Sequence, residues 1–253
     1  MNAKHSRGKN PLSYSERTYR LMEESGLVSS YVRMVETDLH ILAPGNVEEE
    51  ALRLVAGVRR QIETYIRSHV RFGDTLVPLP EDESAPMVIR EMLAAGQAAG
   101  VGPMAAVAGA IAEVVGRGLI DSGVEDLIVE NGGDIFIVRP QECTVAVFAG
   151  PSPLSNRVGI RLTPAMMPAG VCCSSGSVGH SLSLGRADAV VVTARSTPLA
   201  DAAATRIANE VNDSPGSINE ALKVAQSIKG ISGAVVVQGK HLGAWGDVEL
   251  VRL

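Results

Sequence analysis

The chain has 253 residues, of which 45% are hydrophobic and 20% charged, and its formal net charge is −5. A mildly acidic protein lacks the basic field that a nucleic-acid surface usually needs, and 3% aromatic residues are too few for platforms on which bases stack. No apolar run approaches the roughly 20 residues of a membrane-spanning helix. We therefore expect neither nucleic acid nor a membrane as a partner.

The first 17 residues are polar, and we expect them to form a tail that precedes a single domain over residues 18–253. They lack the apolar core of a secretory signal peptide. Three cysteines, two of them the vicinal pair Cys172–Cys173, are no disulfide framework and are interpreted as small buried hydrophobic residues. These features together predict a cytoplasmic protein.

The first half of the chain is predicted to contain two strand segments and three helices, over residues 18–22, 29–43, 46–70, 87–100 and 103–123. Asn46 is a candidate cap for the first helix, and acidic residues follow it in the first turn. A proline-rich connection separates that helix from the next two. The stretch GVGPMAAVAGAIAE, residues 100–113, is rich in glycine and alanine, which favours close packing of a helix or room for a flat cofactor.

The second half is predicted to contain a hairpin around Asn131–Gly133, three further short strands, a buried strand, two helices and a final hairpin, over residues 125–140, 143–150, 157–164, 169–175, 187–194, 197–213, 217–230 and 232–246. Strands joined in hairpins and packed against helices indicate an α+β fold with a mostly antiparallel sheet.

The helix at 197–213 carries an acid and a threonine four residues apart. Thr197 is predicted to be its N-cap and Pro198 its first residue, so that Asp201 and Thr205 share one face. The pattern alone favours a solvated helix face with an acid near the positive end of the helix dipole. The alternative is a hard-cation site, in which a carboxylate and a hydroxyl oxygen hold Mg²⁺ against phosphates.

The hairpin sequence ENGGDI, residues 130–135, is predicted to place Asn131 and Gly132 at positive φ. An ordinary hairpin accounts less well for Gly133 and Asp134. The alternative is a turn whose backbone approaches a ligand closely, with Asn131 or Asp134 supplying polar contacts.

A third stretch, CCSSGSVGHS, contains small residues followed by a histidine. The backbone N–H groups of Ser174, Ser175 and Gly176 could turn toward a phosphate, although many loops are equally rich in serine and glycine. His180 could serve as an acid, a base or a ligand, but a single histidine is more often structural.

Taken in order, these stretches resemble the ApbE family, the FAD:protein FMN transferases, over roughly Gly100 to Val211. The resemblance lies in the glycine-bearing helix, the ENGGDI turn, the SSG step at 174–176, the histidine at 180 and the helix opening ADAAAT at 200–205. It is greatest to a shorter ApbE-like group without a lipoprotein leader. The resemblance implies an α+β fold with two T-fold-like halves.

The resemblance also implies roles for residues. Asp201 and Thr205 would hold Mg²⁺ beside the FAD pyrophosphate, His180 would be catalytic, and a flavin nucleotide, FAD or FMN, would lie along two polar segments: Asn131, Gly132, Gly133 and Asp134, and Ser174, Ser175 and Gly176. The family moves FMN from FAD onto a threonine of an acceptor protein and releases AMP. Positioning and charge neutralisation dominate such a displacement at phosphorus.

Two positions depart from the family pattern. Ser183 stands where the loop after the histidine has an aspartate in the family, and Ala108 stands where the family has a lysine. Both departures weaken the expectation of FMN transfer more than that of a metal pair. Three interpretations therefore stay open: a flavin-nucleotide enzyme, a flavin- or nucleotide-binding protein without catalysis, and a different small-molecule enzyme using His180 and the Cys172–Cys173 pair.

Overall fold

The computed structural model describes residues 26–176, 185–214 and 216–253. Its main sheet has eight strands, all antiparallel to their neighbours. In spatial order they are β1 (Val28–Met34), β2 (Thr37–Ala43), β3 (Leu127–Asn131), β4 (Asp134–Val138), β7 (Ala169–Ser174), β8 (Ala189–Ala194), β9 (Ile231–Gln238) and β10 (His241–Gly246). A second antiparallel sheet contains β11 (Glu249–Arg252), β6 (Val158–Leu162) and β5 (Cys143–Ala146).

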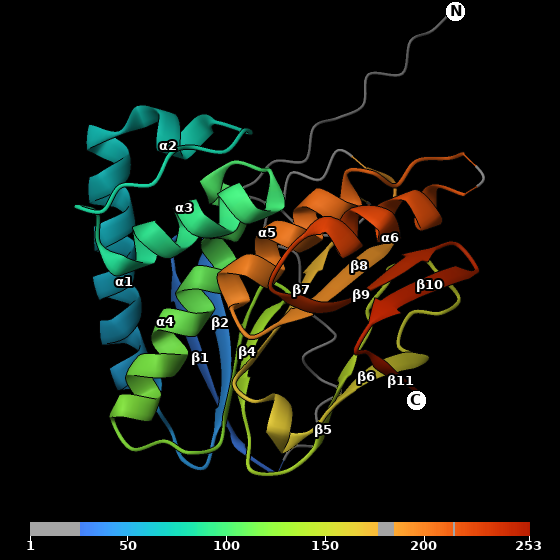
Figure 1. Ribbon diagram of the computed structural model, residues 1–253. Helices are drawn as coiled ribbons and strands as arrows, with labels where there is room; N and C mark the ends of the chain where they lie inside the picture. The colour runs from blue at the N-terminus through green and yellow to red at the C-terminus, as the bar shows by residue number, and fades with distance from the viewer. Residues whose placement is uncertain (1–25, 177–184, 215) are drawn as a thin grey trace, which may run out of the picture.

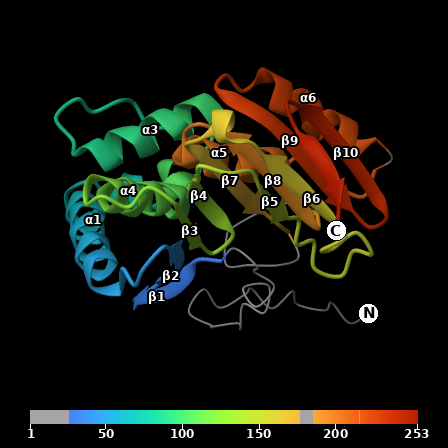
Figure 2. The same cartoon turned by 90° about the horizontal axis from the view of Figure 1, so that it is seen from below.

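The helices gather on one face of the main sheet, with α1 at one end of the molecule and α6 at the other (Figures 1 and 2). They are α1 (Glu48–Ser68), α2 (Val70–Asp74), α3 (Met87–Ala99), α4 (Val107–Asp121), α5 (Thr197–Ala208) and α6 (Ser217–Ser227), with 3₁₀ turns at η2 (Pro103–Ala106) and η3 (Pro164–Met166). The predicted α+β fold with an antiparallel sheet is confirmed. The two T-fold-like halves implied by the resemblance stay a prediction.

Three hydrophobic clusters fill the space between these layers. One lies between β1–β4 and the helices α1, α3 and α4, and a second lies between β7–β9 and the helices α5 and α6. The third lies between the opposite face of the main sheet and the small sheet, and it packs the two sheets together. Leu199 on α5 packs against both of the first two clusters, so α5 lies where they meet.

Small residues let α4 lie close to its neighbours, as the sequence predicts. A Cβ atom added at Gly116 would lie 2.2 Å from the ring of Phe136 on β4.

The combined helix η2–α4, Pro103–Asp121, is long and apolar enough to span a membrane, so the statement that no apolar run approaches that length is wrong. It is the one such helix in the described part of the chain, and 56% of its most apolar 18-residue window is buried, which is typical of a core helix.

The predicted elements mostly hold, with corrected boundaries. Residues 29–43 form two strands rather than one, because the chain turns after Met34, where Val35 has a φ of 54°. The prediction that Asn46 is the N-cap of α1 is wrong by one residue: Val47 is the N-cap and makes no side-chain capping hydrogen bond. The Oδ1 of Asn46, just before it, accepts a 2.9 Å hydrogen bond from the N–H of Glu48. The sequence analysis missed α2 and β11. The strand expected at 18–22 and the domain boundary after residue 17 lie outside the described residues.

Candidate functional site

Helix α5 lies along β7 and shares its direction, because it follows β8, which is antiparallel to β7 (Figure 1). Its first residue, Thr197, packs on Gly170, where an added Cβ would lie 2.6 Å from the Thr197 Cα. With a rise of about 1.5 Å per residue in a helix and about 3.3 Å in a strand, Asp201 comes level with Cys172 and Thr205 with Ser174. The predicted metal residues therefore lie beside the Ser-Gly segment.

The start of α5 differs by one residue from the prediction. Ser196, not Thr197, is the N-cap, since its hydroxyl accepts a 3.3 Å hydrogen bond from the N–H of Leu199. Thr197 is the first helical residue and Pro198 the second. A proline is tolerated there because its missing N–H would have no partner within the helix.

The β3–β4 turn brings the ENGGDI segment to the same place. Asn131 and Asp134 pair across the hairpin, and Gly132 and Gly133 form its two-residue turn with φ values of 72° and 104°. The prediction that Asn131 has positive φ is wrong, and the turn itself explains the second glycine. The side chain of Asn131 donates a 3.0 Å hydrogen bond to the carbonyl of Ala108, which ties the hairpin to the start of α4.

Asp201 is buried and caps a neighbouring helix. Its Oδ2 accepts a 2.8 Å hydrogen bond from the N–H of Gly109 in the first turn of α4. Burial raises the pKa of Asp201 to about 7, although hydrogen bonds from the N–H groups of Gly109 and Ala108 oppose this rise. Since Asp201 and Thr205 are only 8% and 9% exposed, the solvated helix face favoured by the pattern is wrong.

Asp134 is the second buried carboxyl group of the site. It pairs with Cys172 across β4 and β7 and is 3% exposed. Burial raises the pKa of Asp134 well above its usual range, and the nearby charge of Asp201 raises it further. Two carboxyl groups that influence each other in this way lie close together.

Among the described residues, three buried side-chain oxygens have no hydrogen-bond partner: Asp134 Oδ1, Ser174 Oγ and Thr197 Oγ1. Asp134 and Ser174 belong to the sheet face that α5 covers, because partners in register and residues two apart on a strand share a face. Leaving such atoms unpaired is costly, so they mark places where a ligand could bind. No group of three or more His, Cys, Asp or Glu side chains in the described ranges could hold a metal alone.

The Ser-Gly segment only partly fits its predicted role. Ser174 and Ser175 are buried at the end of β7. The N–H of Gly176, however, donates a 3.0 Å hydrogen bond to the carbonyl of Ala187 and so is not turned toward a phosphate. An added Cβ on Gly176 would lie 2.0 Å from the carbonyl oxygen of Gly185, so two backbone segments meet there. His180 and Ser183 lie outside the described residues.

The vicinal cysteines are free thiols on β7, of which Cys172 is buried and Cys173 is partly exposed. Adjacent residues of a strand point to opposite faces, and Cys172 Sγ donates a 3.4 Å hydrogen bond to the carbonyl of Thr197. Burial raises the pKa of the Cys173 thiol to about 12 and that of Cys172 well above its usual range. A thiol that stays protonated is a poor nucleophile.

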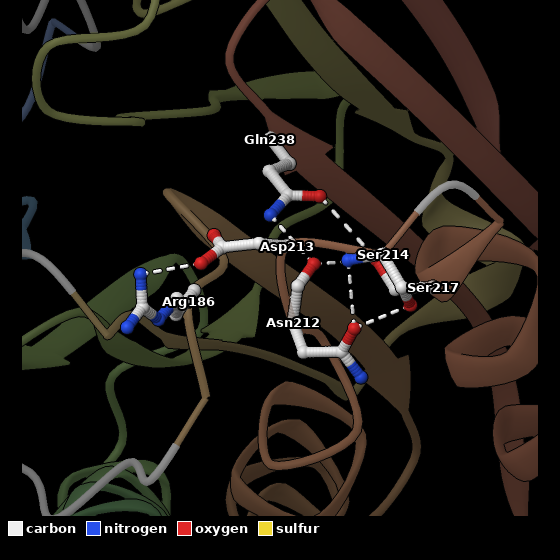
Figure 3. Close-up of polar contacts among 6 residues, drawn as sticks. All are labelled: Arg186, Asn212, Asp213, Ser214, Ser217 and Gln238. Carbon is white, nitrogen blue, oxygen red and sulfur yellow. Dashed lines mark hydrogen bonds and ion pairs between the residues drawn. The ribbon is translucent and has the colours of Figure 1, made fainter.

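The segment after α5 is fastened to the sheet by the contacts in Figure 3. The carbonyl of Asn212 accepts hydrogen bonds of 2.9 Å from Ser217 and 3.0 Å from the side chain of Gln238 on β9. Arg186 forms an ion pair with Asp213. These contacts tie the segment that follows α5 to α6, to β9 and to the residues before β8.

Sequence reasoning missed Glu113 on α4. Its Oε2 accepts a 2.7 Å hydrogen bond from the N–H of Thr197, and its Oε1 accepts hydrogen bonds from Arg117. The available signal was an acid within the apolar run AVAGAIAEVV, where a charge is rarely buried without a partner.

Known proteins with related sequences and structures place the chain in a family. The model of a family described as AbpE bacteria matches residues 20–240. The UPF0280 protein of Methanosarcina acetivorans is 39% identical over 225 residues, 87% of each chain. That of Methanothermobacter thermautotrophicus is 42% identical over 197 residues, 77% of this chain and 76% of the relative.

Two solved structures share the fold. The apo form of the flavinyl transferase ApbE of Pseudomonas stutzeri superposes with a TM-score of 0.55 at 18% identity, over 87% of this chain and 94% of the other. A single-site mutant of the flavin transferase ApbE from Vibrio cholerae gives a TM-score of 0.55 at 14% identity, over 87% and 96%. With the family model covering most of its length, the chain belongs to the ApbE-like family described as AbpE bacteria.

Proposed function

We propose that this protein binds a flavin nucleotide, FAD or FMN, together with Mg²⁺, between the β3–β4 turn, the end of β7 and α5. The observation that carries the proposal is the buried Oδ1 of Asp134, which has no hydrogen-bond partner and lies beside the carboxyl group of Asp201. Proteins that share the fold are named flavin transferases, which supports a flavin nucleotide as the ligand.

The donor set suits Mg²⁺ accompanied by phosphates. Mg²⁺ is usually held by one or two carboxylates and completes its shell with water and substrate phosphate oxygens. Asp201 and Thr205 are the proposed ligands, and Asp134 lies next to them. In the described part of the chain no three His, Cys, Asp or Glu side chains are grouped so that they could hold a metal by themselves, which fits a cation that arrives with a nucleotide. When bound, the cation would neutralise charge on the phosphates.

We place the flavin nucleotide along Asn131–Asp134 and the buried serines Ser174 and Ser175. Asn131 and Asp134 belong to a hairpin tied to α4, so their polar groups are held in fixed positions. Ser174 contributes an unpaired hydroxyl to the same face as Asp134. The N–H of Gly176 already donates to a carbonyl and would not bind the nucleotide. Its lack of a side chain instead lets two backbone segments lie close together beside the site.

FMN transfer from FAD to a threonine of an acceptor protein, or cleavage of the FAD pyrophosphate, is the activity that this ligand allows. His180 is the proposed acid or base. Binding without turnover is the second candidate, and Ala108 favours it. That residue is the second of α4, its backbone N–H lies beside Asp201, and it provides no cation where the family has a lysine. Measuring AMP release from FAD separates the two candidates.

The binding proposal is tested by calorimetric titration with FAD, with and without Mg²⁺. The wild type should bind FAD more tightly with Mg²⁺, and Asp201→Asn should abolish that difference while the protein stays folded. Asp188→Asn is the matched control, since Asp188 accepts a 2.6 Å hydrogen bond from the N–H of Gly239 away from this site. Two results would contradict the proposal: a wild-type affinity for FAD that does not depend on Mg²⁺, or an equal loss of that dependence in Asp188→Asn.

A further inference from the structure

Glu113 is a buried acid whose two oxygens join α4 to the first turn of α5. It is 4% exposed, and its Oε2 accepts the 2.7 Å hydrogen bond from the N–H of Thr197, 84 residues along the chain. Its Oε1 accepts hydrogen bonds of 2.8 and 2.6 Å from Nε and Nη2 of Arg117. Both oxygens therefore have partners, as a buried carboxylate requires.

Thr197 is held tightly on its other sides. A Cβ added at Gly109 on α4 would lie 2.6 Å from the Thr197 carbonyl oxygen, and one added at Gly170 on β7 would lie 2.6 Å from its Cα. These backbone contacts set how closely α5 approaches α4 and β7. They do not fix its rotation about its own axis, which depends on directional contacts such as hydrogen bonds.

The charged groups around Glu113 favour one orientation of its carboxylate, with one oxygen toward Arg117 and the other toward the start of α5. Arg117 lies on one side, with its guanidinium 5.8 Å from the centre of the Phe136 ring. Glu91 on α3 lies near enough that the charge of Glu113, after burial, raises the pKa of Glu91. The carboxylate of Glu113 is thus attracted by Arg117 and by the positive end of the α5 dipole.

We propose that Glu113 is a positioning residue, which sets the rotation and axial position of α5 so that Asp201 and Thr205 face Asp134 and Ser174. The inference rests on the proposed function in one respect, namely that the site so aligned binds Mg²⁺ with a nucleotide. Asp201 lies one helical turn after Thr197 and Thr205 lies two, so a hydrogen bond at Thr197 acts on both.

The positioning role is tested with four variants. Glu113→Ala removes both contacts, whereas Glu113→Gln keeps an oxygen that can accept from the N–H of Thr197. Arg117→Met removes the ion pair alone. Val115→Ala, a core truncation on the same helix, controls for lost stability without a lost polar contact.

Amide hydrogen exchange of Gly109 is the first readout, because this N–H donates to Asp201 and does not contact Glu113. Glu113→Ala should speed its exchange about tenfold, as expected when one hydrogen bond is weakened. Glu113→Gln and Val115→Ala should leave it near the wild-type rate, and Arg117→Met should lie between. Equal acceleration in Glu113→Ala and Val115→Ala, or no rescue by glutamine, would overturn the positioning role.

Mg²⁺-dependent FAD affinity is the second readout, and it separates this inference from the proposed function. Glu113→Ala should bind FAD with Mg²⁺ about tenfold more weakly than the wild type, because one hydrogen bond that orients α5 is lost. Glu113→Gln should recover most of that affinity. A wild type whose FAD affinity does not depend on Mg²⁺ would refute the proposed function. The amide exchange of Gly109 would still decide whether Glu113 positions α5. Normal Mg²⁺-dependent binding by Glu113→Ala would refute positioning alone.

Discussion

The N–H of Gly109 donates a 2.8 Å hydrogen bond to the carboxylate of Asp201, 92 residues along the chain. In return, Glu113 of α4 accepts from the N–H of Thr197 at the start of α5. The two helices are therefore antiparallel, and each supplies the acid that caps the other. Free N–H groups at a helix start favour such acids. The residue proposed to bind a cation thus also belongs to the framework that holds the two helices together.

This double role separates the effects of two substitutions at Asp201. Asp201→Ala removes the cap of α4, and we expect the free energy of unfolding to fall by about 0.5–2 kcal/mol. Asp201→Asn keeps a side-chain oxygen for the N–H of Gly109, so its loss should be smaller at neutral pH. Urea denaturation of both variants without divalent cations measures this. If asparagine destabilises as much as alanine, the hydrogen bond is not what Asp201 contributes to stability.

The raised pKa of Asp201 predicts how stability depends on pH in the absence of divalent cations. Its pKa in the folded protein is about 7 against an ordinary value of 3.8, so between these values the folded state binds more protons than the unfolded state. The free energy of unfolding should therefore fall as pH rises from about 4 to about 7. The raised pKa of Asp134 acts in the same direction.

Urea denaturation at pH 5 and pH 8 in the presence of a chelator tests this prediction. The wild type should be more stable at pH 5, and Asp201→Asn should reduce the difference because it removes one of the two groups. A wild type more stable at pH 8 would show that the hydrogen bonds from α4 outweigh burial and keep the carboxylate ionised.

Local pattern explains what could be predicted of the site, and tertiary contacts explain the rest. The helix holding Asp201 and the hairpin around Gly132 follow from propensity and turn chemistry, which act over a few residues. The burial of Asp201 does not, because the Gly109 that it caps lies 92 residues away. Glu113 was missed for the same reason, since nothing near it in sequence shows that it accepts from Thr197.

Close packing of α4 on α5 predicts that Gly109→Ala is destabilising. An added methyl group would lie 2.6 Å from the Thr197 carbonyl oxygen and 2.9 Å from the Cβ of Asp201, and the backbone oxygen cannot move without the helix. We expect a loss of about 1–3 kcal/mol, typical of overpacking, although alanine favours a helix more than glycine.

Gly57→Ala on α1 is the matched control for this substitution. Nothing lies within 4 Å of a Cβ added at Gly57, so only helix propensity should act there. We expect that variant to be more stable by about 0.5–1 kcal/mol. Similar gains in both variants, measured by thermal or urea unfolding, would show that α4 and α5 separate easily at Gly109.

The cysteines give a last prediction, which bears on the third interpretation of the sequence. Cys172 and Cys173 are held protonated by burial, so both should react with a thiol reagent at pH 8 far more slowly in the folded than in the unfolded protein. Burial also raises the pKa of Cys143, which should be slow for the same reason. Counting the cysteines modified over time, with and without denaturant, measures this. Rapid modification of Cys173 in the folded protein, accompanied by loss of an activity, would favour an enzyme that uses the cysteine pair over one that binds a flavin nucleotide with Mg²⁺.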